Sequence, residues 1–150
     1  MVISIRMVYR MFFFSGNLFG GRLFLNKGDL KFEQISETAG VFQSGWSTGV
    51  SMIDINGDGF DDIYICRSLA SDPELRRNVL LINNQDNTFT DRAAEYGLDD
   101  PSFSHYASFF DFDLDGDLDM YLLNHRIDFN DALKLKYTTD KDGRLSLIHI

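Results

Sequence analysis

Two short stretches of the sequence place oxygen-bearing side chains at alternate positions, a spacing that suits a hard metal ion. The more acidic stretch, 111–119, reads DFDLDGDLD. The earlier stretch, 54–62, reads DINGDGFDD and has Asp, Asn, Asp, Gly and Asp at the first, third, fifth, sixth and ninth places. Alternate side chains of this kind can surround one cation, because Ca²⁺ takes roughly six to eight oxygen ligands from such loops. We therefore interpret both stretches as calcium loops.

The predicted ligands are the oxygens at the first, third, fifth, seventh and ninth places, with a backbone carbonyl at the seventh. They belong to Asp54, Asn56, Asp58, Phe60 and Asp62 in loop one, and to Asp111, Asp113, Asp115, Asp117 and Asp119 in loop two. An all-oxygen set favours Ca²⁺ over zinc or copper, and several carboxylates on a flexible loop favour it over Mg²⁺. The alternative is a pair of solvated acidic turns without metal, whose carboxylates would repel one another.

Both loops begin like an EF-hand but do not continue as one. An EF-hand needs glutamate at the twelfth place, where this chain has Ile65 and Leu122. Both residues fall in apolar runs that we expect to be strands, which excludes a helix–loop–helix arrangement. The ion is therefore expected to clamp the connection between two strands, so that its binding free energy contributes to folding.

Composition restricts the possible partners. The net charge is −9, and the two loops hold nine of the 23 acidic residues, so the acidity is local. Nucleic acid is not expected as a partner, because there is no basic patch to neutralise phosphates. No apolar run is long enough for a transmembrane segment. The single cysteine, Cys66, cannot form an internal disulfide, and its apolar neighbours indicate a buried structural thiol.

The sequence repeats itself at a shift of 57 residues. Residues 23–67 match residues 80–124 at 12 of 45 positions without a gap, and both loops fall within the match. Within each unit, short β-prone runs alternate with polar turns. We expect strands at 22–25, 31–33, 47–53, 63–66, 78–82 and 89–90, and one helical turn at 93–96. Four strands in each unit indicate a blade of a β-propeller.

The loop, its flanks and the period together resemble the FG-GAP/VCBS repeat family, whose blades are related to those of integrin α-subunits. The resemblance runs from Ser15 to Arg126 and rests on LNKGD, AGV and the loop before Ile63 and Tyr64, with their second copies. The FG dipeptide of the family is replaced by Ser47-Thr48-Gly49. Bacterial proteins that resemble cartilage acidic protein are the most similar group.

The resemblance implies an all-β fold, namely a fragment of a β-propeller of four-stranded antiparallel blades that is incomplete at both ends. It also implies an extracellular or cell-surface location, and an adhesion or interaction role with a protein or glycan ligand. The competing interpretation is a non-catalytic or scaffold part of a larger secreted hydrolase or lyase. The residues themselves form no Ser/His/Asp, Cys/His or phosphate-binding constellation, so we do not expect an enzyme.

The expected organisation follows the repeat. Residues 1–14 end a preceding blade, 15–41 form the third and fourth strands of a blade, 42–98 form one blade, 99–126 begin the next, and 127–144 are an insertion. Residues 1–13 suggest a frame error, because a back-translation shifted by one base permits a third acidic loop. Residues 145–150 match a translated sequencing adapter, which indicates an artefact; the alternative is a genuine apolar strand.

Overall fold

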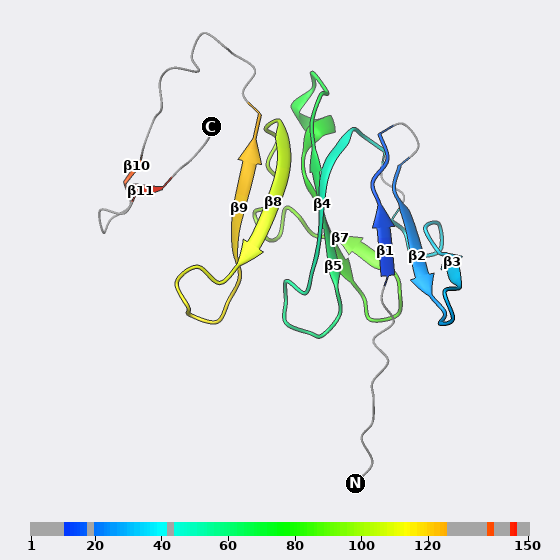
Figure 1. Ribbon diagram of the computed structural model, residues 1–150. Coiled ribbons are helices and arrows are strands. Elements are labelled where there is room, and N and C mark those ends of the chain that lie inside the picture. The colour runs from blue at the N-terminus through cyan, green and yellow to red at the C-terminus, as the bar shows by residue number, and fades with distance from the viewer. Residues whose placement is uncertain (1–10, 18–19, 42–43, 126–137, 140–144, 147–150) are drawn as a thin grey trace.

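The computed structural model describes residues 11–17, 20–41, 44–125, 138–139 and 145–146. The regular structure in this part of the chain is almost entirely antiparallel strands, and the sheets formed by β1 to β9 lie side by side in chain order (Figure 1). The strands are β1 (Met11–Phe14), β2 (Arg22–Asn26), β3 (Phe32–Gln34), β4 (Ser47–Ile53), β5 (Asp62–Arg67), β6 (Val79–Asn83), β7 (Phe89–Asp91), β8 (Ser104–Phe110), β9 (Asp119–Asn124), β10 (Thr138–Thr139) and β11 (Leu145–Ser146).

The central sheet has four strands in the order β4-β5-β6-β7, and each strand pairs with its neighbour in the chain. This meander is the expected four-stranded antiparallel blade. A three-stranded sheet, β1-β2-β3, precedes it, and the hairpin β8-β9 follows it. The all-β prediction is confirmed, and in the described residues the sheets do not close into a ring (Figure 1).

The 57-residue repeat extends to the strand boundaries and the backbone. Strands β2, β3, β4 and β5 begin and end 57 residues before β6, β7, β8 and β9. Hairpins β4-β5 and β8-β9 even share a bulge, between Ser47 and Gly49 in the first and between Ser104 and Tyr106 in the second. A β-bulge at the same place in two units indicates that the bulge is part of the structure of the unit and not a local irregularity.

Both faces of the central sheet are buried, which explains its continuous apolar runs. Alternate side chains of a strand point to opposite faces. Ile63 and Ile65 therefore join the core shared with β1-β2-β3, while Tyr64 and Cys66 join the core shared with β8-β9. Burial raises the pKa of the Cys66 thiol to about 12, which suits the predicted structural role.

Strands β3 and β6 each begin and end one residue later than the expected ranges, 31–33 and 78–82. Asn78 lies outside β6, because its backbone amide bonds to the Asp100 carbonyl at 3.1 Å, outside the central sheet, while its side chain enters a buried hydrogen-bond network. The expected helical turn at 93–96 is present as a single turn: the Tyr96 amide bonds to the Arg92 carbonyl at 3.2 Å, and the Leu98 amide bonds to the Ala93 carbonyl at 2.8 Å across Gly97, whose φ is +68°. The 3-10 helix η1 (Pro73–Arg76) was not expected, although Asp72 before Pro73 is a recognisable start signal.

The two ends of the chain are described only in part. Strands β10 and β11 pair with each other as a two-stranded sheet. The proposed insertion at 127–144 and the suspected adapter at 145–150 otherwise lie outside the described residues, as does most of the segment with the suspected frame error. In the described residues, no helix has the length and apolar character needed to cross a membrane.

Candidate metal loops

The two acidic loops connect the strands of equivalent hairpins. Loop one follows β4 and is closed by the pair Ile53 and Asp62, and loop two follows β8 and is closed by Phe110 and Asp119. The loops lie at the same end of their sheets (Figure 1). The expected placement of each loop as a hairpin connection is thus confirmed.

In loop one, the backbone amides turn toward the carboxylates of the predicted ligands. Gly59 donates to Asp54 Oδ2 at 2.8 Å, and the amide of Asp58 donates to Asp54 Oδ1 at 3.0 Å. Phe60 donates to Asp58 Oδ1 at 2.9 Å. Glycine at position 59 has a φ of +88°, a conformation that side chains disfavour. The loop is therefore wound tightly around its first and fifth residues.

Loop two is wound in the same way. Gly116 donates to Asp111 Oδ2 at 3.1 Å, and the amide of Asp117 donates to Asp115 Oδ1 at 3.1 Å. These bonds are equivalent to the Gly59 and Phe60 bonds of loop one. A third equivalence is the bond from the amide at the second place to the aspartate at the ninth, which is 2.7 Å from Phe112 to Asp119 Oδ2. This hydrogen-bond pattern is therefore common to the loops of both repeat units.

Three of the predicted ligands in loop two lie together. Carboxylate oxygens of Asp111, Asp113 and Asp115 come within 4.8 Å of one another. Asp111 Oδ1 is buried and has no hydrogen-bond partner. A buried, unpaired carboxylate oxygen is unfavourable unless a cation or donor satisfies it. The carboxylate oxygens of loop two are therefore suitable ligands for a hard cation.

The carboxylate of Asp119, a further predicted ligand of loop two, lies outside this cluster. Asp119 accepts the bond from Phe112, and Asp117 was expected to contribute its backbone carbonyl. The hydrogen bond with Asp115 and its negative charge raise the pKa of Asp117. The pKa of Asp115 is lowered, first by the Asp117 amide. Crowded carboxylates therefore perturb one another in this loop.

In loop one, Asn56 stands where loop two has Asp113, so loop one carries one negative charge fewer at this place. Asn56 Nδ2 donates to Asp58 Oδ2 at 3.1 Å. Burial opposes ionisation of Asp58, but the bonds from Phe60, Gln85 and Asn56 outweigh it and lower the pKa of Asp58. Asp58 is therefore held as a carboxylate, the form that a metal requires.

Asp62, the ninth residue of loop one, is fully buried. Its Oδ2 accepts a bond from Ile55 at 3.1 Å, and its Oδ1 accepts one from Asn83 at 2.8 Å. Burial raises the pKa of Asp62, and the two amide bonds offset the rise only in part; the charges of Asp58 and Asp54 raise it further. The neighbouring Asp61 is exposed, in agreement with its place outside the ligand pattern.

Sequence reasoning missed the support that loop one receives from the turn between β6 and β7. The backbone amide of Asn83, the last residue of β6 before this turn, donates to Asp62, and Gln85 Nε2 in the turn donates to Asp58 Oδ2 at 3.3 Å. No sequence signal marked the first contact, because it uses the backbone amide of Asn83. No sequence signal marked Gln85, which stands where the preceding unit has Gly28.

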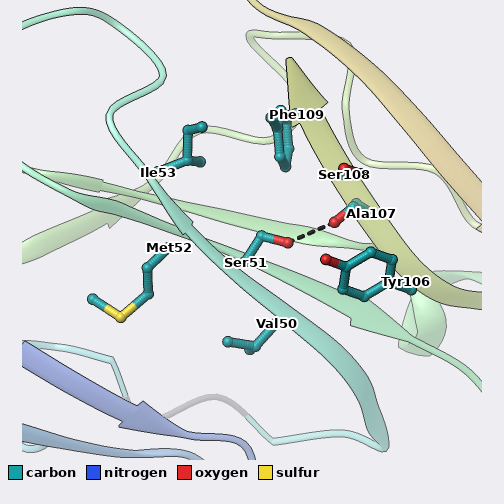
Figure 2. Close-up of a pocket in the computed structure, with 8 residues that line it drawn as sticks. All are labelled: Val50, Ser51, Met52, Ile53, Tyr106, Ala107, Ser108 and Phe109. Carbon is teal, nitrogen blue, oxygen red and sulfur yellow. Dashed lines mark hydrogen bonds between the residues drawn. The ribbon is translucent and has the colours of Figure 1, made fainter.

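A shallow groove of about 340 Å³ lies between the edges of β4 and β8. Figure 2 shows the Ser51 hydroxyl pointing across it to the Ala107 carbonyl, which it bonds at 2.6 Å. Thr48 makes the same kind of bond to the Ser104 carbonyl, also at 2.6 Å. None of the eight lining residues is a histidine, cysteine or carboxylate. The hydroxyls therefore link two sheets here and do not form a nucleophile–base pair.

Comparison with known proteins identifies the repeat. Residues 12–65 match the model of the FG-GAP-like repeat family. The match runs from β1 through loop one into β5, and so contains one complete acidic loop. No curated protein matches the chain.

Proposed function

We propose that this chain, which carries an FG-GAP-like repeat, is a calcium-binding module of a β-propeller in which the ions stabilise the blades. The observation that carries the proposal is the buried, unpaired Asp111 Oδ1 inside a cluster of three carboxylates. The equivalent winding of loop one, 57 residues earlier, supports a second site of the same kind.

The residues of the chain would hold each ion by side-chain and backbone oxygens. In loop two these come from Asp111, Asp113, Asp115 and Asp119, with the carbonyl of Asp117; in loop one they come from Asp54, Asn56, Asp58 and Asp62, with the carbonyl of Phe60. Bound calcium would supply positive charge that relieves the repulsion among these carboxylates. Because each loop joins two strands, binding to the folded state would stabilise the hairpin.

We further propose that the module works in an extracellular or cell-surface setting, in adhesion or another interaction with a protein or glycan. FG-GAP repeats are typically structural or interaction modules, which supports this role. Loop two is largely exposed, and loops of extracellular modules commonly bind calcium with dissociation constants of about 0.1–1 mM. Such sites would be filled at extracellular calcium and largely empty at cytosolic calcium.

Thermal unfolding with and without calcium tests the proposal. If each loop binds with a dissociation constant of about 0.1 mM, calcium at about 1 mM should stabilise the fold by about 1.4 kcal/mol per loop. This corresponds to a rise in Tm of several degrees for a chain of this size. Asp115→Ala should remove most of the increase that loop two provides, whereas Asp61→Ala, at an exposed position outside the ligand pattern, should keep it.

The contrary result is equally clear. A Tm that does not change between excess chelator and millimolar calcium would rule out a structural calcium site in either loop. A rise that Asp115→Ala and Asp61→Ala reduce equally would show general charge screening in place of a site.

A further inference from the structure

Gln85 has an unusual backbone conformation in the turn between β6 and β7. Its φ is +68°, in the left-handed region that side chains disfavour. At the equivalent position of the preceding unit, Gly28 has a φ of +85°. The turn therefore requires this conformation, and this unit accepts it with a long side chain in place of glycine. A residue in a disfavoured conformation is a reasonable starting point for a functional hypothesis.

The side chain of Gln85 reaches loop one. Its Nε2 lies 3.3 Å from Asp58 Oδ2, and the same oxygen accepts the 3.1 Å bond from Asn56. The other oxygen of Asp58 accepts the 2.9 Å bond from the Phe60 amide. Gln85 thus comes from a different hairpin and completes the set of donors that fixes the orientation of this carboxylate.

The turn that carries Gln85 is itself fixed against the loop. The Gln85 amide donates to Asn83 Oδ1 at 2.9 Å, and the Asn83 amide donates to the buried Asp62 at 2.8 Å. Asn84 closes the turn by donating to the Thr88 carbonyl at 2.9 Å. Because the backbone is held on both sides, the Gln85 side chain approaches Asp58 from a defined direction.

We propose that Gln85 is a positioning residue for calcium loop one, which holds the Asp58 carboxylate in the orientation that the ion requires. A carboxylate that is already oriented loses less conformational freedom on binding, so the affinity is higher. The inference rests on the proposed calcium function of the loop. It adds that the neighbouring hairpin sets the affinity of loop one through a contact that the loop sequence does not contain.

A calcium titration of ¹⁵N-labelled protein followed by NMR tests this role. The amides of Gly59 and Gly116 donate to the first aspartate of loop one and loop two, so their signals report each loop separately. In Gln85→Gly, the affinity reported by Gly59 should fall about three- to tenfold, as expected for the loss of one ordinary hydrogen bond at an exposed position. The affinity reported by Gly116 should stay the same, which provides a control within each sample.

Two variants separate the contact from the backbone. Gln85→Asn keeps the amide and tolerates the left-handed conformation but is one methylene shorter, so it should lose the affinity as well. Asn87→Gly relieves the same kind of strain in the same turn, where Asn87 has a φ of +67° and makes no hydrogen bond to the loop. It should leave the affinity reported by Gly59 unchanged.

The Tm of the metal-free proteins provides a second measurement, and it should not fall when the calcium affinity falls. Glycine suits the left-handed conformation, so the Tm of Gln85→Gly in chelator should be equal to or up to about 4 °C above the wild-type value. A purely structural role predicts instead a lower Tm in chelator together with unchanged affinity, and that result would overturn the proposal. Equal losses of affinity in Gln85→Gly and Asn87→Gly would also overturn it.

Failure of the calcium function gives a different pattern. If the wild-type Gly59 signal does not respond to millimolar calcium, loop one is not a calcium site and the role of Gln85 falls with it. If the Gly59 signal responds and Gln85→Gly binds within twofold of wild type, the calcium function stands and only the role of Gln85 is refuted.

Discussion

The buried carboxylate of Asp62 accepts a 2.8 Å hydrogen bond from the backbone amide of Asn83. The bond joins the last residue of loop one to the end of β6, a strand that is not part of the hairpin that carries the loop. Asp62 is fully buried, whereas the equivalent Asp119 is exposed. Asp62 is thus both a predicted calcium ligand and a hydrogen-bond acceptor within the blade. The two roles should affect the free energy of unfolding in opposite ways as the pH changes.

The first prediction concerns the metal-free protein. Burial raises the pKa of Asp62, so the folded state binds this proton more tightly than the unfolded chain does. Its contribution to the free energy of unfolding is full below the ordinary value of 3.8 and is lost as the pH rises through the raised pKa. Urea unfolding in excess chelator between about pH 4 and pH 7 should show this loss in wild type and not in Asp62→Asn.

The exposed neighbour provides the control. Asp61→Asn removes the same charge from the loop but should keep the wild-type pH dependence, because Asp61 is solvated. Saturating calcium should reverse the sign, since a metal requires deprotonated carboxylates and its stabilising effect weakens in acid. Identical pH profiles for wild type and Asp62→Asn in chelator would show that Asp62 is not the responsible group.

A second prediction concerns the buried side-chain amide of Asn78, which lies just before β6 and bonds to β5 and β8. Its Oδ1 accepts from the Arg67 amide at 2.8 Å, and its Nδ2 donates to Tyr64 Oη at 3.0 Å and to Ser104 Oγ at 2.8 Å. Asn78→Ala leaves buried groups without partners and should lower the free energy of unfolding by about 3 kcal/mol. The measurement is chemical unfolding at fixed calcium.

Asn84→Ala is the matched control for this variant, because it is the same substitution at an exposed asparagine whose side chain bonds only to the half-buried Thr88 and the exposed Thr90. It should change the free energy of unfolding by less than about 0.5 kcal/mol. Similar values for the two variants would contradict the role given to the buried network.

A third prediction concerns the close approach of β4 to β8 at Gly49. A Cβ atom at this position would lie 2.4 Å from the His105 carbonyl oxygen and 3.1 Å from the Tyr106 Cα. Both neighbours are backbone atoms and cannot rotate away, so Gly49→Ala must push the two sheets apart. The expected loss of stability is about 1–3 kcal/mol.

Hydrogen exchange can locate this effect. In Gly49→Ala, the amides of β8 and β9 should exchange faster than in wild type, while those of β2 should change little, because β2 packs on the opposite face of the central sheet. Ser51→Ala, which removes one hydroxyl bond without adding volume, should give a weaker form of the same pattern. Uniform acceleration across all strands in Gly49→Ala would argue against a local steric cause.

The sequence by itself determined the repeat, the strands and the predicted ligands. Ser47–Ile53 was expected as a strand with the boundaries that the structure has, and the 57-residue shift defines equivalent strands in both units. These features could be predicted because they depend on local properties: turn residues, β-branched and apolar runs, and oxygen donors at alternate positions. Whether the loops bind calcium remains a prediction.

Only the tertiary structure decided which residues support the loops and join the sheets. The bond from Asn83 to Asp62, the contact of Gln85 with Asp58 and the close approach at Gly49 each connect residues from different hairpins. Such contacts depend on how sheets stack and on which turn lies beside which loop, and neither is encoded in a local spacing. The physical reason is that side-chain periodicity fixes the face that a residue occupies, whereas packing fixes the partner that it meets there.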